Sequence, residues 1–298
     1  MDATAASNEG LDVPADIAAT LIDPTAYADA RIHDAYRWLR ANNPLGVARP
    51  DGYAPFWVVT KHAHIAAISR QNQLFHNADR PTTLSTMAFE ERVRQITGGS
   101  NLVRSLVQMD APDHPRYRAL TQGWFMPANV AKFEPRIREI ARATVQRMIA
   151  KDGRCDFVAD VALFYPLRVI MEILGVPEQD EPRMLRLTQE LFGSQDPDKA
   201  RIRDLLTAEQ LAAMLHAVVS DFSSYFRGIT EDRRRHPRDD LATVIANAKI
   251  DGDYLPEHDA ASYYIIVATA GHDTTSSSTA GAIWALAEHP EQFALVKN

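Results

Sequence analysis

Apolar residues recur every three or four positions along most of this chain, which is the spacing of helices that bury one face. The longest such stripe runs from Leu211 to Ile229 and predicts an amphipathic helix. The same kind of pattern predicts further helices over residues 29–41, 61–69, 129–150, 161–174 and 178–192, and Gly175 with Pro177 ends the one over 161–174. One convincing strand, Phe56–Thr60, follows a cluster of turn residues. We expect a mainly α fold with a small N-terminal β-sheet, a flexible arm over residues 1–20, and mostly loop over residues 77–110.

The last predicted helix is the most informative. Pro256 suits its first turn, and the helical pattern continues to His289, where Pro290 ends it. These residues would span roughly 50 Å at about 1.5 Å per residue, which is the width of a domain. Residues 263–268 are apolar on all sides, so the pattern predicts one long helix that runs through the interior.

The middle of that helix, Ala270–Thr279, is rich in poor helix formers. Gly271 costs about 1 kcal/mol in a helix interior, and the charge of Asp273 needs a partner or water. Ala270 and Gly271 carry almost no side chain, so a flat ligand can approach the backbone closely. The Thr274 hydroxyl can donate to the carbonyl of Ala270, which opens a small groove in the helix. With Asp273 it forms an acid–alcohol pair suited to a proton relay.

A purely structural interpretation of this run is the alternative. Ser and Thr side chains also bond back to the backbone inside close helix–helix contacts that bind nothing. The order Ala-Gly-x-Asp-Thr-Thr, midway along a long buried helix, favours a ligand site.

A second cluster of polar residues lies at Asp110–Arg118. It predicts a short helix that Asp113 caps and in which Pro115 comes early. His114 and Arg118 are then one turn apart on one face, where two donors can clamp a pair of carboxylates on one ligand. A salt bridge from the helix start to a nearby Asp or Glu is the alternative.

The composition sets outer limits on function. The 298 residues are 46% apolar and 24% charged, with a net charge of −7. This is the composition of a folded globular protein, and its acidic balance argues against nucleic-acid binding. No apolar stretch approaches the roughly 20 residues that cross a bilayer, and the acidic N-terminus is unlike a secretory signal. We therefore expect a cytoplasmic protein that binds neither membrane nor nucleic acid.

The remaining chemistry-bearing residues have plainer interpretations. Cys155 is the only cysteine, which excludes a disulfide within the chain, and it is expected to be a small packing residue. Arg233–Arg238 is expected to be a solvated helix end, with a docking patch for an acidic protein as the alternative. The sequence contains no His-Glu-x-x-His motif, P-loop or Gly-rich dinucleotide turn, so it predicts neither a metalloprotease nor direct nucleotide binding.

Several motifs, in this order along the chain, resemble the cytochrome P450 family. Ala270–Thr275 is similar to the oxygen-activation motif of its long distal helix. Asp110–Arg118, followed by Phe125-Met126-Pro127, is similar to its haem-propionate helix. The resemblance runs from about Tyr27 onward, and it is strongest to the bacterial α-terpineol monooxygenase group, because of Tyr165-Pro166-Leu167, Leu174-Gly175-Val176-Pro177 and Ala268–Ser278.

The resemblance implies a haem b cofactor (iron protoporphyrin IX), with His114 and Arg118 on its propionates and with Ala270 and Gly271 over its face. It also implies a monooxygenase that inserts one oxygen atom from O2 into a small apolar substrate, a terpenoid or hydrocarbon. Electrons would come from NAD(P)H through a separate reductase and a ferredoxin-type partner. The protein is expected to be a monomer.

The resemblance assigns roles to the acid–alcohol pair as well. Thr274 would position bound dioxygen and its waters, and Asp273 would deliver protons. Arg183 or Arg186 would hold Asp273 between turnovers.

The sequence departs from the family in one respect. The family ligates iron through the cysteine of a Phe-x-x-Gly-x-x-x-Cys-x-Gly loop, preceded by a Glu-x-x-Arg pair, and the 298 residues contain neither. No metal ligand is therefore assigned in this chain. We expect residues 21–298 to form a partial domain that lacks the haem-ligand region. The alternative is a truncated, non-catalytic remnant or a helical interaction protein.

Overall fold

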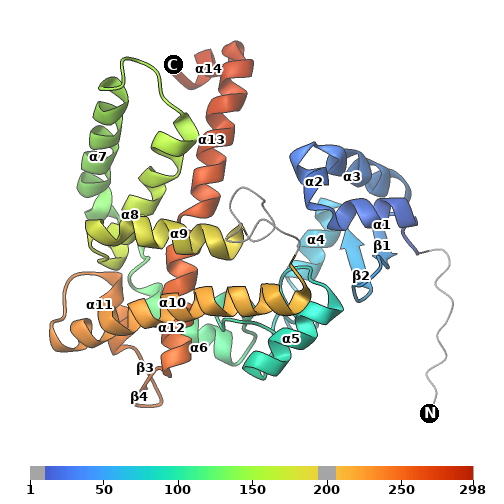
Figure 1. Cartoon of the computed structure of the whole chain (residues 1–298), viewed down its shortest axis with the longest axis horizontal. Coiled ribbons are helices and arrows are strands. Elements are labelled where there is room, and N and C mark those ends of the chain that lie inside the picture. Colours follow the sequence, from blue (N-terminus) through green and yellow to red (C-terminus); the bar gives the residue numbers. More distant parts are fainter. Residues whose placement is uncertain (1–10, 194–205, 298) are drawn as a thin grey trace. The chain divides into compact units, whose positions relative to one another are not determined.

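A computed structural model of the chain describes residues 11–193 and 206–297 (Figure 1). The described residues fall into two compact units. The first contains residues 11–102 and 206–214, and the second contains residues 103–193 and 215–297.

The first unit combines a β-hairpin with short helices. Its elements are α1 (Ala15–Ile22), α2 (Pro24–Ala28), α3 (Arg31–Asn42), β1 (Leu45–Ala48), β2 (Phe56–Val59), α4 (His62–Ser69) and α5 (Met87–Thr97). The strands are antiparallel, with Leu45 opposite Val59, and form the small sheet that the sequence predicts. Leu21, Leu39 and Val58 belong to the core beneath them.

Two predictions for this unit are wrong. Residues 15–20, expected in a loose arm, belong to α1, in which Ala18 and Leu21 are buried; residues 1–10 lie outside the described part of the chain. Residues 87–97, expected in a loop, form α5, which Thr86 caps by accepting from the Phe89 N–H at 3.3 Å. In α5 only Val93 is buried, so the apolar stripe that sequence reasoning needs is missing.

The second unit is almost entirely helical. Its elements are η1 (Leu106–Gln108), α6 (Asp113–Gln122), α7 (Pro127–Ile149), the π turn η2 (Val158–Ala162), α8 (Phe164–Leu174), η3 (Glu178–Asp180), α9 (Glu181–Phe192), most of α10 (Ala208–Arg235), α11 (Leu241–Asn247), β3 (Lys249–Ile250), β4 (Asp253–Tyr254), α12 (Glu257–Ala270), α13 (Asp273–Glu288) and α14 (Pro290–Lys297). The helices predicted over 129–150, 178–192 and 211–229 are confirmed. α8 is the expected core helix, with Leu167, Met171 and Leu174 fully buried.

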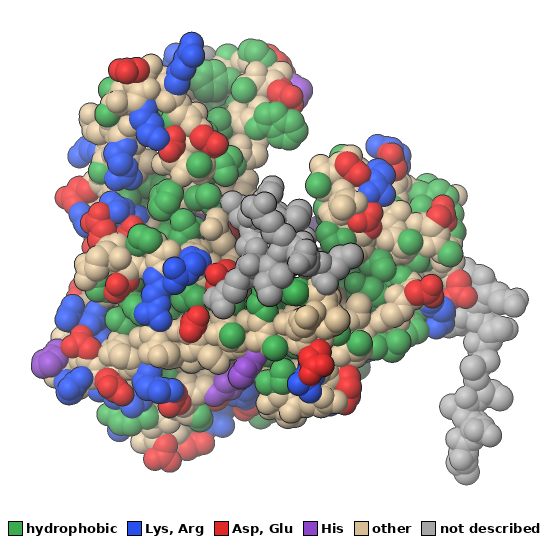
Figure 2. Space-filling model, in the orientation of Figure 1, with side chains coloured by type: hydrophobic (Ala, Val, Ile, Leu, Met, Phe, Trp, Pro, Cys, Tyr) green, Lys and Arg blue, Asp and Glu red, His purple; other side chains and the backbone are tan. Residues whose placement is uncertain are grey.

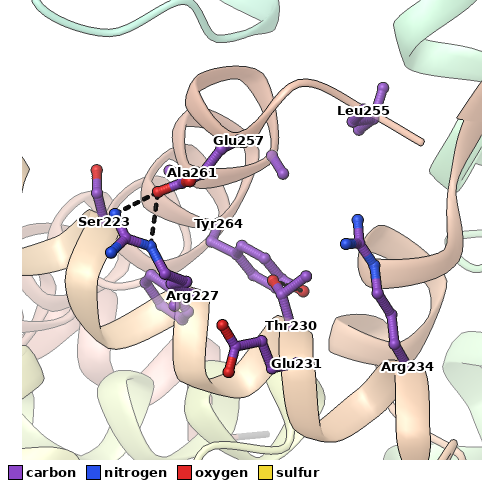
Figure 3. A pocket seen from close by; sticks show the side chains of 11 residues that line it. Ser223, Arg227, Thr230, Glu231, Arg234, Leu255, Glu257, Ala261 and Tyr264 are labelled. Carbon is purple, nitrogen blue, oxygen red and sulfur yellow. Dashed lines mark hydrogen bonds and ion pairs between the residues drawn. The ribbon is translucent and has the colours of Figure 1, made fainter. Parts of the chain in front are cut away.

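Aromatic side chains join α10 to α12. The rings of Phe226 and Tyr264 are stacked with centroids 4.6 Å apart, and burial raises the pKa of Tyr264 to about 12. A pocket of about 190 Å³ opens beside Tyr264 (Figure 3). The ion pair between Arg227 and Glu257 crosses its rim, so opposite charges there already neutralise each other.

The prediction of a solvated helix end over Arg233–Arg238 is wrong for Arg233. α10 continues to Arg235, and Arg233 is only 2% exposed. Its guanidinium lies 2.6 Å from Asp240 and donates to the Gly175 carbonyl at 2.8 Å. Gly175 ends α8 with a φ of 74°, and a Cβ there would overlap the Asp240 carboxylate. The arginine therefore joins three elements, α8, α10 and the N-terminus of α11.

The surface of the described chain mixes charges of both signs. Figure 2 shows acidic and basic side chains interspersed on one face, and Arg238 of the basic segment pairs with Asp232. Cys155 is exposed, so its prediction as a packing residue is wrong. Among the helices described, none is long and apolar enough to cross a membrane.

Candidate functional site

The predicted long helix is broken in its middle. α12 ends at Ala270 and α13 begins at Asp273, so the prediction of one continuous helix is wrong. At the break the His272 N–H bonds to Thr269 at 3.2 Å, three residues back instead of four. The Thr274 hydroxyl donates to the Ala270 carbonyl at 2.9 Å, as the sequence predicts. The side chain thus takes up a backbone acceptor at the point where the regular helix is interrupted.

The broken segment presents a polar, open face. Ala270 and Thr274 are exposed, and Asp273 is half-buried. A groove of about 450 Å³ continues along α13, lined by Thr274, Thr275, Ser278, Thr279, Ala282 and Ile283. Within the described part of the chain Asp273 has no ion-pair partner, so contact with water satisfies its charge.

Arg183 and Arg186, expected to hold Asp273, do not pair with it. The guanidinium of Arg183 lies over the ring of Tyr225 instead, 5.1 Å from its centroid. Arg186 is exposed.

Gly271 faces the protein interior, unlike its neighbour Ala270. A Cβ at this position would lie 2.8 Å from both Cδ1 and Cγ1 of Ile170 on α8. Gly271 therefore permits close packing of α8 against the break. For this residue the structure supports the packing interpretation, whereas Ala270 remains available to a ligand.

We expect Gly271→Ala to be less stable than Gly281→Ala by about 1–3 kcal/mol, the usual cost of overpacking. Gly281, in α13, has nothing within 4 Å of a built Cβ. Gly271 lies in the break and Gly281 inside α13, so only Gly281→Ala gains the full helix propensity of about 1 kcal/mol. The part of the difference beyond that gain measures the contact with Ile170. Urea unfolding followed by circular dichroism gives both values, and equal stabilities would contradict the packing role.

His272 is a site residue that sequence reasoning missed. Its side chain is fully buried, and Nε2 lies 2.8 Å from the Leu163 carbonyl. Because a carbonyl can only accept, Nε2 carries the proton and Nδ1 does not. Nδ1 and the nearby Ser276 hydroxyl are buried and lack hydrogen-bond partners within the described residues. The only available signal was an imidazole within a segment expected to be buried.

We expect His272 to make the fold sensitive to acid. Burial lowers the pKa of this imidazole below its ordinary value of 6.5. The unfolded chain therefore binds a proton near pH 6.5 that the folded chain takes up only at lower pH, so stability falls as the pH drops below that value. The free energy of unfolding should fall more in the parent than in His272→Gln between about pH 7.5 and about pH 5.5. Equal losses would exclude this role.

α6 presents the second predicted cluster. His114 is half-buried and Arg118 is exposed, one turn apart on the helix. Across residues 11–193 and 206–297 neither forms an ion pair, so the salt-bridge alternative is not realised. Asp113, predicted to cap the helix, instead pairs with Arg104.

α6 packs on the face of α12 that continues toward Ala270 and Thr274. The hydroxyls of Thr121 and Tyr263 lie 2.6 Å apart. Ala270 and Thr274 follow Tyr263 by seven and eleven residues, which places them within about 20° of its direction around the helix. Gly271 and His272 keep right-handed helical dihedrals at the break. The helical spacing along α12 therefore runs from the α6 contact at Tyr263 toward the segment from Ala270 to Thr274.

Comparisons with known proteins identify the family of the chain. Residues 83–298 match the family model described as Cytochrome P450. The chain is 46% identical over 289 residues to cytochrome P450-terp of a Pseudomonas species, covering 96% of this chain and 68% of that protein. It is 28% identical to the steroid C26-monooxygenase of Mycolicibacterium smegmatis, covering 91% of this chain and 59% of that protein.

Solved structures give the same result. CYP108D1 from Novosphingobium aromaticivorans superposes with a TM-score of 0.84 at 44% identity, covering 96% of this chain and 67% of that one. CYP268A2 of Mycobacterium marinum, solved with pseudoionone, gives 0.80 at 26% identity, covering 94% and 65%. The chain belongs to the cytochrome P450 family and has its mainly helical fold. By family resemblance it belongs to an enzyme of the monooxygenase class.

The residues of α6 and of the helix break fit the haem that the family binds. An imidazole and a guanidinium one turn apart, neither in an ion pair with the described residues, are a suitable donor set for two carboxylates. The small, exposed Ala270 leaves room for a flat ring system against the helix. No group of three or more His, Cys, Asp or Glu in the described residues could hold a metal ion by itself. A haem iron needs only one protein ligand, and we assign none among these residues.

Proposed function

We propose that this chain forms the oxygen-binding side of the haem b pocket in a monooxygenase that acts on a small apolar, terpenoid-like substrate. One observation carries the proposal: the Thr274–Ala270 hydrogen bond stands at a helix break beside the half-buried carboxylate of Asp273. The α6 helix of the same unit carries His114 and Arg118, neither of which forms an ion pair with a described residue. When bound, haem b would supply the iron chemistry that reduces O2 and transfers one oxygen atom to the substrate.

The chain's own residues would bind the cofactor and handle protons. His114 and Arg118 donate hydrogen bonds to the two propionates. The Thr274 hydroxyl gives its hydrogen to the Ala270 carbonyl, so its oxygen is free to accept a hydrogen bond from a water. Asp273 is in contact with solvent and is one residue from Thr274, so it can pass protons from bulk water to that water.

The substrate class, redox partner and assembly are inferred by analogy. The relatives include a protein named P450-terp and one solved with pseudoionone, which supports a terpenoid or similar hydrocarbon. Delivery of NAD(P)H electrons through a separate reductase and a ferredoxin-type partner is proposed by analogy with the family. Monomeric state remains a prediction.

One observation favours the second candidate, a helical interaction protein. α13 and α14 expose large apolar side chains, among them Trp284 at 67% and Val296 at 73%. Exposed apolar patches of this kind can mark contact surfaces. Stoichiometric haem uptake by the full-length protein would decide for the monooxygenase.

Thr274→Ala tests the proton role. We expect the variant to keep its haem but to form roughly 10²-fold less product per NAD(P)H, the lower end of the usual contribution of a general acid–base group. The missing electrons should appear as peroxide. Thr20→Ala is the matched control, because Thr20 makes the same backbone bond at 2.9 Å to Asp16 in α1. Unchanged product per NAD(P)H in Thr274→Ala would contradict the proposal.

A further inference from the structure

Arg104, Tyr117 and Asp259 form a half-buried to buried cluster that joins α6 to α12. Arg104 Nη1 lies 2.8 Å from Asp259 Oδ2 and donates to the Tyr117 hydroxyl at 3.1 Å. The Tyr117 hydroxyl in turn donates to Asp259, and both residues are only 7% exposed. The pKa of Tyr117 is raised above its ordinary value, mainly by burial and secondly by the hydrogen bond to Asp259, so its hydroxyl keeps its proton.

A second contact between α6 and α12 lies one helical turn beyond the contact between Tyr117 and Asp259. Thr121 follows Tyr117 by four residues, and Tyr263 follows Asp259 by four. The hydroxyls of Thr121 and Tyr263 lie 2.6 Å apart, and Tyr263 also donates to the Tyr117 carbonyl at 3.3 Å. Two bonded pairs, one turn apart on each helix, fix the rotation of α6 about its own axis.

That rotation decides where His114 and Arg118 point. Arg118 directly follows Tyr117, and His114 precedes it by nearly one turn, so both directions are set once Tyr117 is held.

Arg104 has an electrostatic effect as well. It pairs with Asp113, the neighbour of His114, and with Asp259. Without Arg104, the carboxylate of Asp113 would be available to His114 or Arg118 and would compete with a carboxylate ligand.

We propose that Arg104, Tyr117 and Asp259 are positioning residues for the haem propionates, because they orient α6 and because Arg104 neutralises the Asp113 carboxylate, which would otherwise compete for His114 and Arg118. This inference rests on the proposed haem function. It adds residues that do not touch the cofactor but determine how firmly α6 holds it.

The test measures haem b affinity in the full-length protein, by competition with apomyoglobin, together with the resonance Raman bands of the propionates. Tyr117→Phe and Arg104→Gln should each bind haem roughly tenfold more weakly and shift those bands. Tyr264→Phe is the matched control, because it removes a buried hydroxyl of α12 that bonds Ala242 at 3.0 Å and does not contact α6. Adding Asp113→Asn to Arg104→Gln should restore most of the affinity.

Each outcome bears on the inference. Equal haem affinity in Arg104→Gln and the parent would overturn it and leave the proposed function intact. An equal loss in Tyr264→Phe, or failure of Asp113→Asn to restore affinity, would reduce the cluster to a structural role and also overturn it. A parent protein that takes up no haem would overturn the proposed function itself, and the inference with it.

Discussion

Replacing Arg233 by methionine is expected to lower the free energy of unfolding by roughly 3–5 kcal/mol, the usual cost of leaving a buried charge unpaired. Asp240 is only 5% exposed and lies 2.6 Å from the Arg233 guanidinium. The same carboxylate caps α11 by accepting from the Thr243 N–H at 2.8 Å. The Gly175 carbonyl would lose a donor too.

Urea unfolding measures this effect, and Arg235→Met provides the control. Arg235 lies two residues along the same helix and is exposed, so its change should stay within about 0.5 kcal/mol. A loss below about 1 kcal/mol in Arg233→Met would show that the buried pair contributes no more than a surface pair does.

Replacing His114 and Arg118 together by glutamine is expected to weaken haem b binding by roughly 10²- to 10⁴-fold. Hydrogen bonds to charged groups contribute about 1.5–3 kcal/mol each, and two would be weakened together. The folded chain should be little affected, because neither side chain forms an ion pair with the described residues.

Competition for haem with apomyoglobin measures the loss of affinity. Arg116→Gln is the control, because Arg116 lies on the same helix but pairs with Asp251 at 2.6 Å. A loss of less than about threefold in the double variant would mean that α6 does not hold the propionates.

The features that the sequence predicted are those that neighbours along the chain determine. The Thr274–Ala270 bond follows from a spacing of four residues in a helix. The same spacing places His114 and Arg118 on one face of α6. The stripe from Leu211 to Ile229 gave α10 for the same reason, since one face of it is buried.

The features that sequence reasoning missed depend on partners far along the chain. His272 bonds to a carbonyl 109 residues earlier, and Arg104 bonds to Asp259 across 155 residues. The helix break follows from local residues that weaken the ladder. Its position against Ile170 of α8 could not be read from spacing.

The burial of Arg233 in a charged segment also depends on a partner far along the chain. A run of charges at a helix end is usually solvated. Here Gly175, which lies 58 residues earlier, provides one of the acceptors that allow the guanidinium to be buried. Local composition carries no information about such a partner.

A structure of the full-length protein with haem b bound tests the central claim most directly. The account predicts the porphyrin beside Ala270, with its propionates within hydrogen-bond distance of His114 and Arg118 and with Thr274 still bonded to Ala270. A porphyrin bound elsewhere, or a face from Ala270 to Thr274 covered by protein side chains, would contradict it.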